Sequence, residues 1–110
     1  SLPLTNKNPI APGMLASHYA PRTPLRIVHQ IPIEPPPETG LLTLQPPDRD
    51  GGFAKIEALS KQGDLIEAAS QFFQALHRLD QANLALILAT PFPQNGLGLA
   101  LNDRLQRASH

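Results

Sequence analysis

The sequence predicts an α/β fold, with a mostly parallel sheet of about four strands and helices packed against it. Two adjoining patterns in residues 64–90 lead to this prediction. Directly before residue 84, apolar residues recur at steps of four and three, which is the period of one helix face: Leu65, Ala69, Phe72, Leu76 and Leu79. Residues 84–89 are apolar at every position, as in a strand covered on both faces. A helix that leads into such a strand is half of a βαβ unit, which joins parallel strands.

The first 24 residues are predicted to form an extended arm, and residues 25–110 the folded domain. Of the 13 prolines, 11 lie in the first 47 residues, and those of the arm interrupt any regular period. Gly13 follows a proline and can take a positive φ, which is typical of a turn. His18, Tyr19 and Arg22 offer an imidazole, a phenol and a guanidinium, groups that suit phosphate oxygens and a base or ribose face. The alternative is that they are linker residues, solvated or packed on their own domain.

Three short strands are predicted before the helix, at Pro24 to Ile31, Gly40 to Gln45 and Phe53 to Ser60. Prolines at positions 32 and 35–37 end the first strand and indicate a polyproline crossover. Residues 46–52 have the turn chemistry of an exposed loop. Its Asp48 and Asp50 are spaced like the start of a calcium loop, but the downstream ligands are missing, so we interpret them as solvated turn residues.

The ends of the helix are predicted from its flanking residues. Asp64 and Glu67 have the spacing of a capping box, in which Asp64 accepts from a helix N–H and Glu67 reaches back. Asn83 is the predicted stop, and Ile66 and Phe73 are expected to widen the apolar stripe. A last amphipathic helix is predicted from a second set of apolar residues: Leu97, Leu101, Leu105 and Ala108.

Gly96 and Gly98 at the head of this last helix allow two interpretations. A glycine-rich turn after a strand can cradle a phosphate. This turn lacks the third glycine, the lysine and the downstream acid of the specific fingerprints. The plainer interpretation is that small residues let the helix begin close to the sheet. The chain carries no Ser-His-Asp arrangement, no cluster of metal ligands and no full nucleotide loop, so by itself it is not expected to be catalytic or to hold a metal.

Composition excludes several classes of protein. There is no cysteine, which excludes a disulfide framework and a thiolate zinc site and fits a reducing, cytoplasmic setting. No apolar run approaches the roughly 18 residues of a membrane span. The chain begins with serine rather than methionine, so we treat it as part of a longer protein.

Charge is balanced overall but unevenly distributed. The formal net charge is zero, which argues against a non-specific nucleic-acid binder. Residues 1–33 contain three basic residues and no acid, whereas residues 34–103 contain nine acids and four basic residues. Arg104 and Arg107 follow near the end of the last helix, where cations are favoured. The acid-free arm is the part expected to lie against something anionic.

Two stretches of the chain resemble one known family, the long-form threonylcarbamoyl-AMP synthases. The arm resembles the family's linker in Pro12-Gly13-Met14, in His18-Tyr19-Ala20-Pro21-Arg22 and in Pro24. The end of the chain is similar to the last helix of the family's C-terminal domain in Gly96-Leu97-Gly98-Leu99-Ala100-Leu101-Asn102-Asp103-Arg104-Leu105 and in Arg107-Ala108. The central helix and the apolar strand after it are similar in order and spacing. The resemblance covers about residues 8–110.

The resemblance implies a small Rossmann-like, three-layer accessory domain joined by a linker to an N-terminal YrdC-like catalytic domain. That catalytic domain would use ATP with magnesium, threonine and bicarbonate to make threonylcarbamoyl-adenylate for tRNA modification, a nucleotidyl transfer. A partner complex would then transfer the threonylcarbamoyl group to tRNA. The linker would close over the catalytic pocket, with Gly13 as the turn and His18, Tyr19 and Arg22 facing the ligand. This chain would bind no nucleic acid directly and would cross no membrane.

The sequence departs from the family at two places. Residues 15–17 are Leu-Ala-Ser where the family usually has basic or aromatic residues, and residues 31–39 are proline-rich where the family commonly has a helix. We therefore expect a fold with one helix fewer on one face. Two other functions stay open at this point: an autonomous nucleotide-binding regulatory module that uses Gly96 and Gly98, or a scaffold for the tRNA-modification partners that uses Arg104 and Arg107.

Overall fold

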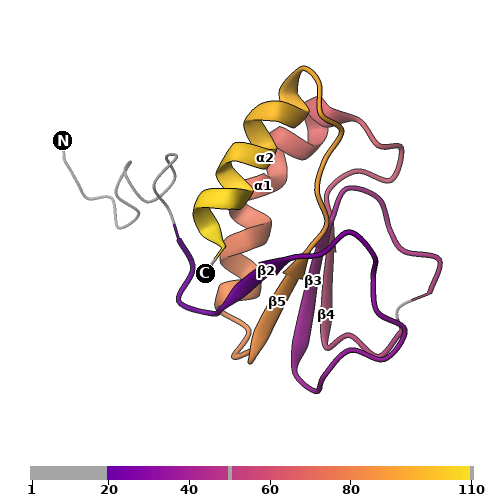
Figure 1. Ribbon diagram of the computed structural model, residues 1–110, viewed down its shortest axis with the longest axis vertical. Helices are drawn as coiled ribbons and strands as arrows, with labels where there is room; N and C mark the ends of the chain where they lie inside the picture. The colour runs from indigo at the N-terminus through magenta and orange to yellow at the C-terminus, as the bar shows by residue number, and fades with distance from the viewer. Residues whose placement is uncertain (1–19, 50, 110) are drawn as a thin grey trace, which may run out of the picture.

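A computed structural model describes residues 20–49 and 51–109 of the chain. Its elements are the strands β2 (Leu25–Ile27), β3 (Thr39–Thr43) and β4 (Lys55–Ala58), the helix α1 (Leu65–Asp80), the strand β5 (Leu86–Ala89) and the helix α2 (Leu97–Ala108). The four strands form one sheet in the order β2-β5-β3-β4, and every neighbouring pair is parallel. The predicted α/β class and parallel sheet are thus confirmed (Figure 1). The strands are shorter than their predicted ranges, because the flanking residues belong to the turns.

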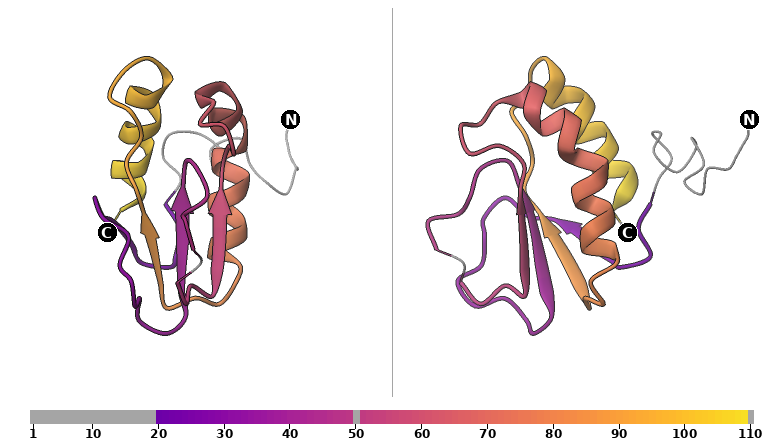
Figure 2. Two further views of the ribbon diagram at one scale, coloured as in Figure 1. Left: turned by 90° about the vertical axis from the view of Figure 1, so that its right-hand side faces the viewer. Right: turned by 180° about the vertical axis from the view of Figure 1, so that it is seen from behind.

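Both helices lie on the same face of the sheet, and the connecting loops lie on the other (Figures 1 and 2). The proline-rich connection from β2 to β3 contains no helix, as the departure at residues 31–39 led us to expect. The described residues of the connection from β3 to β4, 44–49 and 51–54, likewise form no helix. The second face of the sheet is therefore bordered by loops. No helix among the described residues is long and apolar enough to cross a membrane.

The sheet is buried most deeply at its centre, where β3 lies between β5 and β4. All five residues of β3 are buried. Successive strand residues point to opposite faces. Accordingly, Ile87 and Ala89 of β5 pack in the cluster beneath the helices, and Leu88 between them is also buried, at 5% exposure. The prediction of a strand covered on both faces is confirmed for β5.

Helix α1 begins at a cap that the sequence predicted only in part. Asp64 Oδ1 accepts from the Ile66 N–H at 2.9 Å, as expected for the cap. Glu67 does not reach back to Asp64 itself. Ser60, which is buried, lies between them: its hydroxyl accepts from the Asp64 N–H at 2.9 Å and donates to Glu67 Oε1 at 2.7 Å. The capping box is therefore closed through the hydroxyl of a residue in the preceding turn.

The apolar stripe of α1 is narrower than predicted on one side. Its buried residues are Ala68, Phe72, Ala75, Leu76 and Leu79. Ile66, expected to widen the stripe, is 72% exposed, because it lies two residues, or about 200° of helical rotation, before Ala68. Phe73 is half-buried, and its ring meets that of Phe72 edge-on, with centroids 5.2 Å apart. Asn83, the predicted stop, has φ 58° three residues after the helix ends.

Candidate functional site

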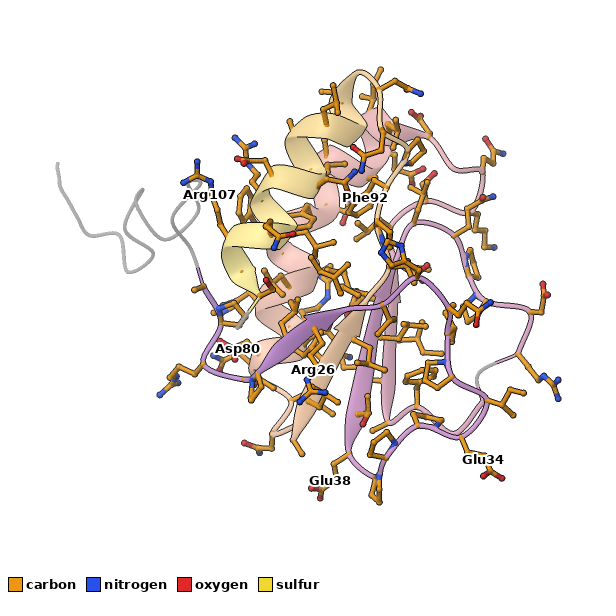
Figure 3. All side chains as sticks on the ribbon, viewed as in Figure 1. Arg26, Glu34, Glu38, Asp80, Phe92 and Arg107 are labelled. Atoms are coloured by element: carbon orange, nitrogen blue, oxygen red, sulfur yellow. The ribbon has the colours of Figure 1, made fainter. Side chains whose placement is uncertain are left out.

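The segment that leads into β2 is held to the end of α1 by one carboxylate. Asp80, the last residue of α1, accepts from the backbone N–H of Arg22 at 3.2 Å and from that of Thr23 at 2.9 Å. The Thr23 hydroxyl also donates to Asp80 Oδ1, at 2.8 Å. Pro21 is buried and Thr23 is 8% exposed, so this contact is packed as well as hydrogen-bonded. Figure 3 labels Asp80 beside the segment before β2. We call Arg22, Thr23 and Asp80 the arm anchor.

The predicted arm residues meet the described part of the chain only at Arg22. Gly13, His18 and Tyr19 lie outside the described residues. Arg22 is exposed, and its backbone N–H is part of the arm anchor. The predicted glycines, Gly96 and Gly98, lie at the other end of the helix layer, where α2 begins (Figure 1). The structure therefore does not bring Arg22 and the two glycines into one pocket.

Gly98 is required by a close backbone contact. A Cβ atom at this position would lie 1.8 Å from the carbonyl oxygen of Pro93. The small residue lets α2 begin against the loop after β5, not against the sheet itself. The Gly98 N–H donates to the Asn95 carbonyl at 2.9 Å, so it is already used within the turn. Gly96 has φ 54° and ψ −132°, a backbone conformation that favours glycine.

Asn102 fixes the same loop from the middle of α2. Its Oδ1 accepts from the Phe92 N–H at 2.8 Å, and its Nδ2 donates to the Phe92 carbonyl at 2.9 Å. Phe92 is 3% exposed, and its ring approaches that of Phe72 with centroids 6.2 Å apart. One side-chain amide thus satisfies both backbone groups of a buried loop residue and holds the loop against the core.

The carboxyl ends of β3 and β5 are joined by hydroxyl groups. Thr90 Oγ1 hydrogen-bonds Thr43 Oγ1 at 3.0 Å, and the Thr43 hydroxyl lies 3.2 Å from the Gln45 carbonyl, to which it donates. Chain connections leave these two strands in opposite directions, which is where open α/β sheets commonly bind ligands. In this chain the two threonines are paired with each other at that position.

An ion pair ties α1 to the edge strand β4. Arg78 Nε and Nη2 donate to Glu57 Oε2 and Oε1 at 2.9 and 2.8 Å. The hydrogen bond to Glu57 raises the pKa of Arg78, while partial desolvation opposes this shift. The Arg78 side chain is 48% exposed, so this is a surface ion pair between α1 and β4.

Two grooves mark the surface of the described residues. The larger, of about 630 Å³, lies between the outer strand β2 and α2 and extends to the loop after β5. We call it the β2–α2 groove; its lining is Leu25, Arg26, Ile27, His29, Pro91, Gln94, Asn102, Leu105, Gln106 and Ser109. The second, of about 390 Å³, lies between the two loops on the opposite face. Within residues 20–49 and 51–109, no three His, Cys, Asp or Glu side chains gather in a way that could hold a metal ion.

Comparison with known proteins agrees with this architecture. Residues 2–110 match the family described as threonylcarbamoyl-AMP synthase, C-terminal domain. The chain belongs to this family. It is also similar to the threonylcarbamoyl-AMP synthase of Bacillus subtilis (strain 168), with 31% identity over 116 aligned positions. That alignment covers 94% of the chain and 33% of the relative, so the chain spans about a third of the relative's length.

Sequence reasoning missed the most connected polar residues of this synthase-family domain. It gave Asp80, Thr23 and Asn102 no role of their own. A signal was present in each case, because an Asp at the last position of a helix and an Asn on an otherwise apolar helix face both need hydrogen-bond partners. The sequence alone did not indicate which partners they would find.

Proposed function

We propose that this chain is a non-catalytic accessory domain that positions a gating arm in an L-threonylcarbamoyladenylate synthase. In this proposal the catalytic part lies outside the chain, in a YrdC-like domain of the same cytoplasmic protein. That part uses ATP with magnesium, threonine and bicarbonate to form the adenylate, which a separate transferase machinery consumes in tRNA modification. Membership of the family supports the general role in threonylcarbamoyl-AMP synthesis.

The observation that carries the proposal is the arm anchor. A single carboxylate accepts three hydrogen bonds from two consecutive residues that lie 57 and 58 positions away in sequence. A hydrogen bond to a charged group contributes about 1.5–3 kcal/mol, less where water competes, as at exposed Arg22. The anchor therefore fixes the point at which the arm leaves the domain, and it makes the folded domain the base from which the arm acts.

An arm that closes over a pocket needs a fixed point of attachment, which the arm anchor provides in this proposal. A segment that covers a pocket excludes water from a hydrolysable adenylate, and its opening can set the rate of product release. If the arm were attached loosely to the domain, ordering its first residues on closure would cost conformational entropy and so reduce the free energy of binding to the pocket. We propose that Gly13 supplies the turn and that His18, Tyr19 and Arg22 face the ligand when the arm closes.

The experiment compares adenylate formation and release in the full-length protein that contains this domain, with and without the anchor. Asp80→Ala removes the acceptor, and we expect faster loss of the adenylate to water and a changed turnover, with ATP binding retained. Asp103→Ala is the matched control, because Asp103 is also a helical carboxylate, but it pairs with Arg107 on the exposed side of α2. Unchanged release in a folded Asp80→Ala protein, or ATP and threonine consumption by the 110-residue chain alone, would overturn the proposal.

A further inference from the structure

The groove lies between α2 and β2, which is the outermost strand of the sheet within residues 20–49 and 51–109. Three consecutive strand residues, Leu25, Arg26 and Ile27, line it. Since β2 is the outermost strand of the sheet among the described residues, the groove lies at this side of the sheet. On the helix side, the lining residues run from Asn102 to the C-cap Ser109, a stretch of eight positions that rises about 10 Å.

Backbone groups of β2 are directed into this groove. The Val28 N–H donates to Ala89 of β5 at 2.8 Å, and the Pro24 carbonyl accepts from Ile87 at 2.8 Å. Strand backbone groups alternate in direction, so the N–H and C=O of Ile27 point away from β5, toward the open side. Leu25 has the same direction, but it is fully buried. Ile27 is half-buried, and β2 has no neighbouring strand on that side among the described residues.

The polar lining of the groove favours a negatively charged occupant. Arg26 and His29 contribute a guanidinium and an imidazole, and Gln94 and Gln106 contribute amides. No carboxylate lines the groove within the described part of the chain. The apolar lining residues of β2 and α2 are Leu25, Ile27 and Leu105, of which Ile27 is half-buried and the other two are fully buried. The lining thus combines hydrogen-bonding groups and the positive charge of Arg26 with the apolar, half-buried Ile27.

We infer that this groove binds an extended, acidic segment of a partner protein, which adds to β2 as a further strand. Its backbone would pair with Ile27, an apolar side chain would pack on the half-buried Ile27 side chain, and its acidic side chains would meet Arg26 and His29. Strand addition of this kind uses main-chain hydrogen bonds for affinity and side-chain pockets for specificity.

Charge disfavours two simpler occupants. The chain's own first 19 residues contain Lys7 and no acid, so they lack the charge that complements Arg26. A second copy paired edge to edge through β2 would bring two Arg26 side chains together. The short strand, Pro24 before it and Arg26 within it are all features that discourage unselective pairing at a sheet edge. Arg26 discourages pairing with an uncharged or basic strand, but it can form an ion pair with an acidic segment.

The test is a titration of the isotope-labelled 110-residue chain, followed by nuclear magnetic resonance. The probe is a blocked heptapeptide in which valine alternates with glutamate. We expect shifts at Ile27, His29 and Gln94, and an affinity that falls at least about tenfold in Arg26→Glu. Arg49→Glu is the matched control, because it makes the same charge change beside the second groove on the opposite face and should leave binding unchanged.

Several outcomes would overturn the inference. One is equal binding by a peptide in which lysine replaces glutamate, and another is equal binding by a peptide whose central backbone nitrogens are methylated. Complete displacement by inorganic phosphate at the same concentration would indicate a small-anion site instead. Shifts confined to residues 44–54, no binding at all, or occupation of the groove by a second copy in sedimentation would also contradict it. Because this test uses no synthase assay, its failure would leave the gating proposal standing.

Discussion

Replacing Gly98 with alanine would place a methyl group where the backbone of Pro93 already lies. The added Cβ would be 1.8 Å from the Pro93 carbonyl oxygen and 2.9 Å from its carbonyl carbon. Neither atom belongs to a flexible side chain that could move aside. The loop is also held by the two hydrogen bonds between Asn102 and Phe92, so any shift of the loop strains a second contact.

The magnitude follows from two opposing effects. Helix propensity favours alanine over glycine by up to about 1 kcal/mol in a helix interior, and by less in the first turn, where Gly98 lies. Overpacking costs about 1–3 kcal/mol, and contact with backbone belongs at the upper end of this range. We therefore expect a net loss of about 2 kcal/mol in the free energy of unfolding, or roughly 8–16 °C in Tm for a domain of this size.

Thermal and urea unfolding of the 110-residue chain measure this loss. Leu99→Ala is the matched control, because Leu99 lies next to Gly98, is 54% exposed and should change stability by less than about 0.5 kcal/mol. A Gly98→Ala protein as stable as the parent, or more stable, would refute the packing argument. If Gly98→Ala kept its stability but lost measurable ATP binding, the phosphate-loop interpretation would replace it.

Three further changes test the local contacts. Asn102→Ala leaves both backbone groups of buried Phe92 without their partner, and should cost about 1–3 kcal/mol in urea unfolding; a loss below about 0.5 kcal/mol would show that the amide does not hold the loop. Ser60→Ala breaks the relay that caps α1 and should cost about 1 kcal/mol, whereas Ser70→Ala, on the exposed side of the same helix, should cost less. Arg78→Ala should cost less than about 1 kcal/mol, and the cost should shrink in high salt. Because the hydrogen bond to Glu57 raises the pKa of Arg78 above its ordinary value, the stability that the Arg78 charge contributes is lost only as the pH rises through that raised pKa, so the cost should be equal at about pH 6 and 9.

The elements that could be predicted from sequence are those with a local, periodic signature. The last helix was predicted from the spacing of Leu97, Leu101, Leu105 and Ala108, and α2 spans Leu97–Ala108. The apolar run of residues 84–89 predicted a strand covered on both faces, and β5 has that burial. Ile66 was misplaced because the breadth of an apolar stripe depends on what packs against it, and Ile66 is 72% exposed in the structure.

The polar contacts could not be predicted, since they join residues far apart in sequence. Asp80 and Thr23 are 57 residues apart, and nothing near either residue indicates the other. Asn102 and Phe92 are ten residues apart, but the pairing depends on how the loop after β5 turns back on α2. Such contacts follow from the packing of the helices on the sheet, so they become visible only once that packing is known.

Amide hydrogen exchange at Thr23 tests the arm anchor most directly. In the 110-residue chain, the Thr23 N–H donates to Asp80 and should be protected. Asp80→Ala should lower this protection about 30-fold, corresponding to roughly 2 kcal/mol, while the amide of Leu88 in the core keeps its rate. If Thr23 exchanges equally fast in both proteins, the domain does not hold the arm at this point, and the account of an arm based on a folded support is contradicted.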